Sequence, residues 1–378
     1  MFKSVGQAIA GYFKTTDKLL LVLALSATGY GMLVLAAVFR SFGSDPRGLY
    51  VQIGGTVFGL LCAVILSKFD YKLLGKLWKL HVPLAYGLVA ATFIFGYGRL
   101  GAGNDNLNWI SLPFGASLQP SEFLKVSFIL SFAYHLEKIK DNINRIIPLL
   151  GLCLHGAVPV LVIHFQGDDG MALVFIFIFA AMLFSAGLSM RYLAVAGILG
   201  VIAVPLVWTF ILHDEQRRRF QSIFTPGIDP LGIEYQQNSG LISIGSGQLS
   251  GIGLFADSHR FVDEIQNDFI FAFIGESLGL VGCIAALCLI FAVATKVLFI
   301  SRIAKDTLGL TICVGIFAMI TAQTIINVGM CLKLLPVIGI TLPFFSKGGS
   351  SILSIYLALG LALSVYTHRS SALFSESG

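Results

Sequence analysis

Charged residues are scarce in this chain of 378 residues: Asp, Glu, Lys and Arg together make up 12% of it, whereas apolar residues make up 56%. The mean hydropathy is +0.86. A soluble globular domain usually contains about 25% charged residues. The shortage of charge therefore excludes a soluble globular enzyme. It predicts an all-α, polytopic membrane protein, because helices satisfy their own backbone hydrogen bonds in lipid.

Cysteines are few, and none is arranged as a ligand. The six cysteines lie in or at the ends of apolar runs, with no CxxC pair and no histidine at ligand spacing. This pattern predicts no disulfide framework and no zinc site. The formal net charge of +5 is also spread too thinly along the chain to predict binding to nucleic acid.

Long apolar runs, in contrast, are abundant. About ten of them approach the roughly 20 residues that a helix needs to cross a bilayer. They cover residues 19–39, 50–67, 81–98, 122–136, 146–164, 170–188, 192–212, 268–298, 308–332 and 349–367. We expect a single transmembrane domain over residues 1–378, with both termini on the same side of the membrane because the number of spans is even.

The distribution of lysine and arginine indicates the orientation of these spans. Basic residues gather in the loops on the side of the two termini. Cytoplasmic loops of membrane proteins carry such an excess of Lys and Arg. Both termini are therefore predicted to be cytoplasmic, and residues 213–267, which precede the eighth span, are predicted to form a large extracytoplasmic loop.

The segment from His213 to Asp268 is unusually polar for this chain and is punctuated by glycines. Connections of this length are usually functional or disordered. Its interspersed apolar residues argue against disorder. We interpret the segment as the active-site region.

Ionisable residues occur at membrane depth in two other places. Glu122 and Lys125 lie three residues apart at the start of the fourth predicted span, so they share a helix face and can pair. Asp168 and Asp169 lie where two apolar runs nearly meet. Such residues mark functional sites because an unpaired charge in lipid costs several kcal/mol. A structural ion pair for Glu122 and Lys125, and a solvated turn for Asp169, fit the spacing equally well.

Prolines and glycines interrupt the chain near its C-terminal end. The stretch from Gln323 to Ser351 contains Asn327, Pro336 and Pro343 and ends in GGSS. Irregular backbone close to the membrane is tolerated where it is buried in protein or lines a wet cavity. We therefore expect a cavity wall here, although glycine and serine also serve as helix-packing residues.

Five sequence blocks carry a family resemblance. They are, in order, QPSEFLK, QGDDGMA, RRRF with YQQNSGLISIGSGQLSGIGLF, NDFIFAFIGESLGLVG, and NVGMCLKLLPVIGITLPFFSKGGSS. Over nearly the whole chain they resemble the SEDS family, the RodA, FtsW and SpoVE proteins of bacterial cell-wall synthesis. The chain length and short termini look most like RodA. The chain departs from the family pattern at Asn108, in residues 167–170, in residues 263–267 and at Lys347.

The resemblance implies a peptidoglycan glycosyltransferase of the bacterial cytoplasmic membrane that serves cell elongation, division or sporulation. Its substrate would be lipid II, a disaccharide-pentapeptide on undecaprenyl diphosphate, polymerised into glycan strands at the outer face. The family pattern implies Asp268 as the essential residue and points to Glu122, Lys125, Asp168 and Ser350. It also implies a class B penicillin-binding protein, a transpeptidase, as partner.

The residue types suit that reaction. Transfer of a sugar to a 4-hydroxyl group needs a base for the hydroxyl proton and cations for the departing diphosphate. We predict that Asp268 is the general base and lies in the first turn of the following helix. A carboxylate at a helix start is also stabilised by the helix dipole without any role in catalysis.

Five basic side chains are candidates for binding the diphosphate: Lys125, Lys347, Arg217, Arg218 and Arg219. Arginine binds phosphate oxygens in a bidentate manner. A run of three arginines beside a membrane also suits contact with anionic headgroups. The sequence requires no cofactor, and a Mg²⁺ or Mn²⁺ ion between diphosphate and carboxylate would be chemically reasonable.

A transporter that moves the lipid-linked precursor across the bilayer is the alternative function. Many helices, intramembrane charges and a helix region broken by glycine and proline suit a transporter as well. Three features favour the enzyme: the two halves show no obvious internal repeat, the charged candidates cluster on the outer side, and the longest loop is predicted to be extracytoplasmic.

Overall fold

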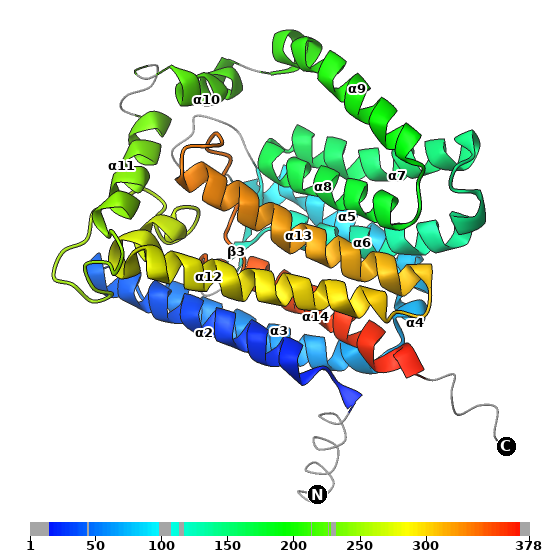
Figure 1. Cartoon of the computed structure of the whole chain (residues 1–378), viewed down its shortest axis with the longest axis horizontal. Helices are drawn as coiled ribbons and strands as arrows, with labels where there is room; N and C mark the ends of the chain where they lie inside the picture. The colour runs from blue at the N-terminus through cyan, green and yellow to red at the C-terminus, as the bar shows by residue number, and fades with distance from the viewer. Residues whose placement is uncertain are drawn as a thin grey trace, which may run out of the picture.

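A computed structural model describes residues 15–43, 45–97, 107–112, 117–212, 214–225, 227 and 232–370. Helices dominate these residues (Figure 1). Three short antiparallel strands, β1 (Gly96–Tyr97), β2 (Trp109–Ser111) and β3 (Ser117–Leu118), form a small sheet in the order β1-β2-β3, with Ile110 opposite both Gly96 and Leu118. The predicted all-α class is confirmed.

Each of the ten predicted spans coincides with a helix. These helices are α2 (Lys18–Ser41), α3 (Arg47–Lys68), α5 (Trp78–Phe95), α6 (Pro120–Ile139), α7 (Ile146–Phe165), α8 (Asp169–Ser185), α9 (Met190–Leu206), α12 (Ile270–Arg302), α13 (Thr307–Cys331) and α14 (Gly349–Thr367). Among the described residues, eight helices are long and apolar enough to cross a membrane. The other two are α8, which has 17 residues, and α6, which contains Glu122 and Lys125. The chain is polytopic, and the number of ten crossings stays a prediction.

The bundle is built around α13 and α14. In the most apolar stretch of each of these helices, 78% of the residues are buried. Helix α14 packs along α3, while α13 lies between α12 and α8 (Figure 1). Small residues permit the close approach of α3 and α14. A Cβ atom added at Gly59 would lie 2.9 Å from Cβ of Tyr356, and one at Gly360 would lie 2.7 Å from Cα of Ala63. Such small residues are the usual means by which membrane helices pack closely.

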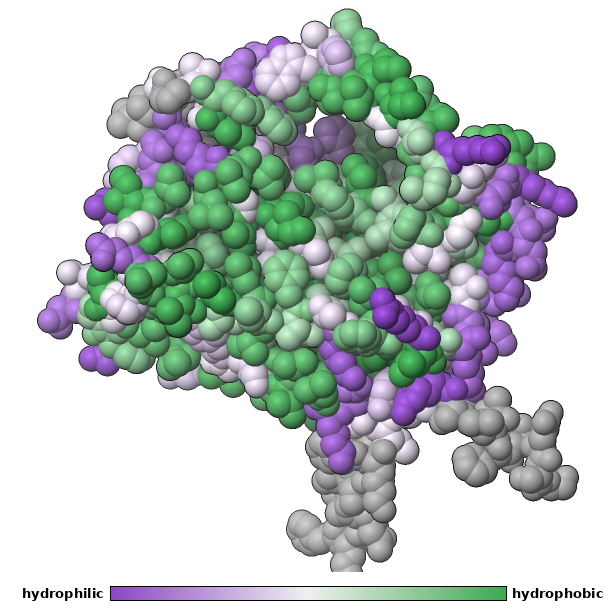
Figure 2. Space-filling view, in the orientation of Figure 1, coloured by the Kyte–Doolittle hydropathy of each residue, from purple (hydrophilic) through white to green (hydrophobic). Residues whose placement is uncertain are grey.

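The outer surface of the bundle is apolar. Large hydrophobic side chains such as Val57, Phe58, Leu61 and Ile65 of α3 are more than half exposed. Figure 2 shows hydrophobic residues over the middle of one face and hydrophilic residues toward its edges. Exposed apolar patches of this extent mark a surface that faces lipid rather than water.

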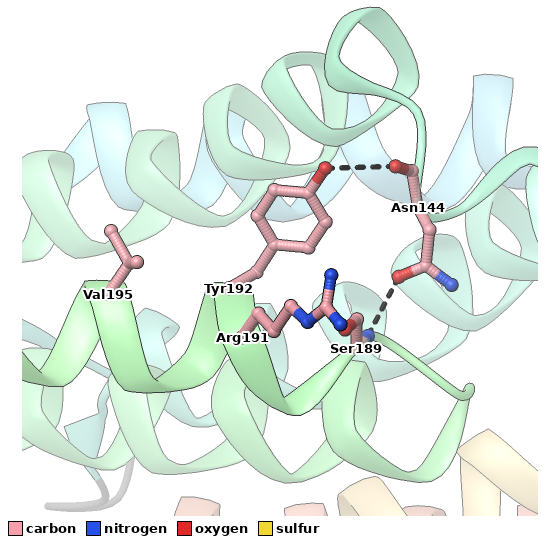
Figure 3. Close-up of a pocket in the computed structure, with 5 residues that line it drawn as sticks. All are labelled: Asn144, Ser189, Arg191, Tyr192 and Val195. Carbon is pink, nitrogen blue, oxygen red and sulfur yellow. Dashed lines mark hydrogen bonds between the residues drawn. The ribbon is translucent and has the colours of Figure 1, made fainter.

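Helix α9 stands apart from the rest of the bundle (Figure 1). None of its residues is buried, and a π-helical turn, η3 (Val207–Ile211), extends it. Its N-terminal end is anchored: the Tyr192 hydroxyl donates to the Asn144 carbonyl at 3.0 Å, and the Ser189 N–H donates to Oδ1 of Asn144 at 2.7 Å. These residues, with Arg191 and Val195, line an open pocket of about 510 Å³ (Figure 3).

The segment predicted as a long loop, residues 213–267, is not an irregular loop. Although His213 lies outside the described residues, the segment contains α10 (Asp214–Phe224) and α11 (Ile233–Ser246). Helix α11 packs against α12 and α13. The Gln237 side chain donates to the carbonyls of Met330 at 3.0 Å and Leu335 at 2.7 Å. The face of α11 that docks on the bundle is mainly polar, because Gln237 and Ser243 are buried whereas Tyr235, Leu241 and Ile242 are exposed.

The residues after α11 fill a break in α12. Gly279 has φ 63° and ψ −162°, which interrupts the helix. Backbone groups on both sides of this break bond to the connection instead: the Glu276 carbonyl accepts from the Ile252 N–H, and the Leu280 N–H donates to the Gln248 carbonyl, both at 2.9 Å. A backbone with this φ and ψ is essentially restricted to glycine. The connection thereby supports the first half of α12, directly after Asp268.

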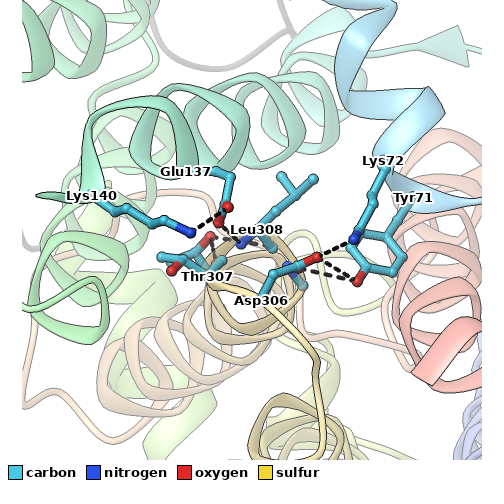
Figure 4. A network of polar contacts seen from close by, with 9 residues as sticks. Tyr71, Lys72, Glu137, Lys140, Asp306, Thr307 and Leu308 are labelled. Atoms are coloured by element: carbon cyan, nitrogen blue, oxygen red, sulfur yellow. Dashed lines mark hydrogen bonds and ion pairs between the residues drawn. The ribbon is translucent and has the colours of Figure 1, made fainter. Parts of the chain in front are cut away.

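A polar network ties the bundle together at the end where α2 begins and α14 ends (Figures 1 and 4). Asp306, the N-cap of α13, accepts from Lys72 of α4 (Tyr71–Lys76) at 2.8 Å and from the Tyr71 hydroxyl at 3.1 Å. Glu137 of α6 accepts from the Leu308 N–H at 2.9 Å. The network joins α4, α6 and α13. Burial would raise the pKa of Asp306, but hydrogen bonds from Lys72 and a backbone N–H, with the charge of Lys72, lower this pKa overall.

We expect Asp306→Ala to reduce the free energy of unfolding by about 1–2 kcal/mol, since it removes both the helix cap and the ion pair. Because the folded pKa lies below the ordinary value of about 3.9, the carboxylate stabilises the fold above that pH, and the stabilisation is lost as pH falls through the lowered pKa. Thermal unfolding in detergent at neutral and acidic pH measures this. Asp141→Ala, at an exposed site on the same end, is the control. An unchanged melting temperature of Asp306→Ala at neutral pH would contradict the assignment.

Candidate functional site

Asp268 lies on the turn directly before α12. The helix begins at Ile270 with Phe269 as its N-cap. Asp268 therefore lies just before the N-cap, and the expectation that it belongs to the first helical turn is wrong. The reason is local: the Phe269 N–H bonds back to the Glu264 carbonyl at 3.2 Å, which extends the turn before the helix starts. The Asp268 side chain is half-buried and faces Gly339, where an added Cβ would lie 3.6 Å from Oδ2 of Asp268.

The connection between α13 and α14, residues 332–348, is bonded to the turn that carries Asp268 directly near its C-terminal end and, at Ile340, through Asn327 of α13. Asn327 Nδ2 donates both to the Asp268 carbonyl at 2.8 Å and to the Ile340 carbonyl at 2.7 Å. The Ser346 hydroxyl donates to the Asn267 carbonyl at 2.5 Å. The Lys347 N–H donates to the Gln266 carbonyl at 2.8 Å. These bonds place Lys347 beside the turn of Asp268. The predicted cavity wall at residues 323–351 is therefore a segment that faces the proposed catalytic residue.

Glu122 and Lys125 form the ion pair predicted from their spacing. Lys125 Nζ lies 3.0 Å from Oε2 of Glu122. The Ser354 hydroxyl of α14 also donates to that oxygen at 2.5 Å. Both Glu122 and Lys125 are 0% exposed, so in this conformation they contact only protein. A direct contact with substrate is thus not what this geometry offers, because a lipid-linked sugar reaches only exposed groups.

Asp168 belongs to the same buried region. It caps α8, accepting from the Met171 N–H at 3.0 Å through Oδ1 and from Gln119 Nε2 at 3.0 Å through Oδ2. The Gln119 N–H in turn donates to the Ser350 hydroxyl at 3.2 Å. Burial, together with the charge of Glu122, raises the pKa of Asp168 to about 6, although its hydrogen bonds and Lys125 act in the opposite direction.

We refer to these side chains as the buried cluster, which joins α6, α8 and α14. Its members are Gln119, Glu122, Lys125, Asp168, Ser350 and Ser354. Asp169 points away from it, bonding to His164 Nδ1 at 2.5 Å and to the Gln216 side chain of α10. The two adjacent aspartates therefore face different parts of the molecule.

Comparison with known proteins identifies the family. The model of the cell cycle protein family of FtsW, RodA and SpoVE matches residues 17–371. The chain belongs to this family.

Relatives of the FtsW/RodA/SpoVE family align over most of the chain. The peptidoglycan glycosyltransferase MrdB of Escherichia coli K12 is 30% identical over 359 residues, which cover 93% of this chain and 94% of MrdB. Stage V sporulation protein E of Bacillus subtilis 168 is 31% identical over 361 residues, which cover 92% of this chain and 96% of that protein. The predicted SEDS resemblance is confirmed, and the match to MrdB is consistent with its RodA-like character.

Solved structures of the family share the fold. One chain of a peptidoglycan synthase complex that coordinates polymerization and crosslinking is 27% identical, with a TM-score of 0.80 over 94% of this chain and 99% of that chain. A mutant of the rod shape-determining protein RodA of Thermus thermophilus is 25% identical, with a TM-score of 0.69 over 94% and 98% of the two chains.

In this FtsW/RodA/SpoVE protein the three arginines of α10 make different contacts. Arg217 donates to the carbonyls of Trp208 at 2.8 Å and Thr209 at 2.9 Å, so its guanidinium group closes the end of the helix before it. Arg218 is exposed and has no hydrogen bond or ion pair among the described residues. Arg219 donates to the Val337 carbonyl of the 332–348 connection at 3.4 Å. Successive helical residues point about 100° apart, which is why only one of the three reaches that connection.

Several residues with polar contacts in and around the candidate site were not predicted from the sequence as site residues. Gln119 and Ser354 complete the buried cluster, and Gln119 stands in the QPSE block, which was the available signal. Glu276 of α12 accepts from the Arg260 N–H at 2.9 Å and lies 3.4 Å from His259 Nδ1.

Among the residues that the structure describes, no group of three or more His, Cys, Asp or Glu is placed to hold a metal ion.

The buried ion pair predicts a paired effect on stability. Lys125→Met leaves the Glu122 carboxylate buried without a countercharge, so we expect the free energy of unfolding to fall by about 3–5 kcal/mol. The double variant Glu122→Gln/Lys125→Met should recover most of this loss. Thermal unfolding in detergent measures both, with Lys138→Met at an exposed site on the same helix as control. A double variant no more stable than Lys125→Met would show that the two charges are not coupled.

Proposed function

We propose that this protein is a peptidoglycan glycosyltransferase that polymerises lipid II into glycan strands, with Asp268 as its general base. The activity follows from family relatives such as MrdB, named a peptidoglycan glycosyltransferase, which aligns over 93% of this chain. The observation that carries the assignment of the base is the half-buried carboxylate of Asp268, held on a turn that is bonded to the 332–348 connection. A rigid support is what a catalytic group requires.

The proposed reaction is a single displacement at the donor sugar. The acceptor 4-hydroxyl oxygen forms a bond to the anomeric carbon, and the bond from that carbon to the diphosphate oxygen breaks. Asp268 takes the hydroxyl proton, while the electron pair leaves with the diphosphate. Lys347 and Arg219 supply positive charge for the leaving group, since both lie on or against the 332–348 connection. One displacement inverts the anomeric configuration.

The buried cluster has a supporting role in this proposal. Ser350, at the start of α14, is held by the Gln119 N–H, and Gln119 is held by Asp168. The cluster therefore fixes the point at which the 332–348 connection enters α14. Glu122 and Lys125 contribute by joining α6 to α14 through Ser354.

We further propose that the end of the bundle carrying Asp268 faces the outside of the bacterial cytoplasmic membrane. The opposite end holds the basic residues Lys72, Lys140, Arg302 and Lys305, as expected of a cytoplasmic face. Both termini would then be cytoplasmic, with residues 213–267 extracytoplasmic. A chain of similar fold belongs to a peptidoglycan synthase complex, which supports a class B penicillin-binding protein as partner of this protein too.

Asp268→Asn and Asp268→Ala test the general base. We expect each to lower the polymerisation of lipid II by the purified protein at least about 100-fold, because a general base contributes about 10²–10⁴ in rate. Polymer length and yield are measured by gel separation of labelled lipid II. Asp263→Asn, an exposed carboxylate five residues earlier, is the matched control and should retain activity. Wild-type activity in Asp268→Ala would contradict the assignment.

The same preparation tests the alternative of lipid transport. Liposomes that contain the protein and lipid II should yield polymer if the enzyme proposal is correct. Movement of lipid II between leaflets without any polymer would favour the transporter instead.

A further inference from the structure

Gln52 is a buried amide in an otherwise apolar helix. It lies in α3, and its residue is 1% exposed. Its side chain bonds to two residues of the 332–348 connection. Nε2 donates to the Ser346 carbonyl at 3.2 Å, and Oε1 accepts from the Gly348 N–H at 2.9 Å. Gln52 therefore bonds to the residues on both sides of Lys347. A buried amide costs free energy unless it is hydrogen-bonded, and here both of its polar atoms are satisfied.

The connection needs this support because it is strained just before the bonded residues. Phe344 has φ 69°, a left-handed conformation that is unfavourable for a bulky side chain. Its carbonyl oxygen would lie 2.3 Å from a Cβ added at Gly31 of α2. The turn is thus pressed against α2 on one side and held by α3 on the other. Strained turns persist only where the surrounding structure holds them in place.

The side chain of Lys347 packs against α3 at Gly48, on the same face as Gln52. Gly48 lies four residues before Gln52, so the two positions are neighbours on the helix surface. A Cβ added at Gly48 would lie 2.8 Å from Cε of Lys347 and 2.6 Å from Cζ of Phe39. The Lys347 ammonium group lies 5.9 Å from the centroid of the Phe39 ring. Helix α3 therefore determines both the backbone position of Lys347, through Gln52, and the path of its side chain, across Gly48.

We infer that Gln52 is a positioning residue for the glycosyl transfer: it holds the backbone of Lys347 beside the turn of Asp268 and so sets the position from which the Lys347 side chain meets the lipid diphosphate. This inference rests on the proposed function. Gln52 does not itself touch substrate in this arrangement, because it is buried behind Ser346 and Gly348. Its effect on catalysis passes through the position of Lys347.

A double-mutant cycle tests the inference with the full-length protein and lipid II. Gln52→Leu replaces the amide by an apolar side chain of similar size and removes both hydrogen bonds. We expect it to lower kcat/KM by about 10- to 100-fold, as a misplaced group near the reacting atoms does. Lys347→Met should lower kcat/KM as well, and Gln52→Leu should then have little further effect in the Lys347→Met background. Additive losses, or unchanged kinetics in Gln52→Leu, would overturn the inference.

A matched control separates positioning from general loss of packing. Ser364→Ala removes another buried hydrogen bond between α14 and the end of α3, in which the Ser364 hydroxyl donates to the Phe69 carbonyl at 2.6 Å. Ser364 lies near the C-terminal end of α14, whereas Lys347 precedes the start of that helix. We expect Ser364→Ala to leave kcat/KM unchanged at equal amounts of folded protein. A loss in Ser364→Ala as large as that in Gln52→Leu would contradict a positioning role.

Hydrogen exchange gives a readout that does not depend on activity. Gln52→Leu should speed exchange of the Gly348 amide by roughly fivefold, the effect of one lost hydrogen bond, whereas Ser364→Ala should not. Mass spectrometry of the peptide that contains Gly348 measures this. If the wild-type protein makes no polymer, the proposed function fails while the exchange result still tests the contact of Gln52. Unchanged exchange in Gln52→Leu would overturn the inference.

Discussion

The pairing of residues 266–268 with the 332–348 connection is the interaction on which the candidate site depends. Two irregular segments meet there, and their backbone groups are satisfied by one another and by the side chains of Asn327 and Ser346. Near a membrane, irregular backbone is stable only when such partners are present. The pairing therefore does two things at once: it removes an energetic cost, and it fixes Asp268 relative to Lys347.

The polar side chains of the bundle follow the same constraint. Glu122, Lys125 and Asp168 are buried among apolar helices, and each is bonded to a partner on its own or a neighbouring helix. Because a buried charge without a partner is costly, such groups persist where they perform a task. In the proposed mechanism that task is mechanical: the cluster joins α6, α8 and α14, while Asp268, Lys347 and Arg219 lie on or against the 332–348 connection.

Helix α9 contrasts with this rigid region. It contributes no buried residue and is anchored mainly at its N-terminal end through Asn144, whereas α13 and α14 are almost enclosed. Packing density therefore differs sharply within one bundle. The elements that carry Asp268 and Lys347 lie on the dense side, which suits groups that must be held in fixed geometry, while α9 and α10 lie at the loosely packed side (Figure 1).

Hydropathy and spacing were sufficient for the all-α polytopic fold, the positions of the helices and the pairing of Glu122 with Lys125, because these are properties of neighbouring residues. The motif blocks were sufficient to identify the family. Tertiary packing decided the rest. Helices within residues 213–267, the divergence of Arg217 from Arg219, and the contact of Gln52 with a segment 296 residues away depend on how helices dock. Sequence periodicity carries no information on contacts at such separation, since each helix face is equally apolar toward protein and toward lipid.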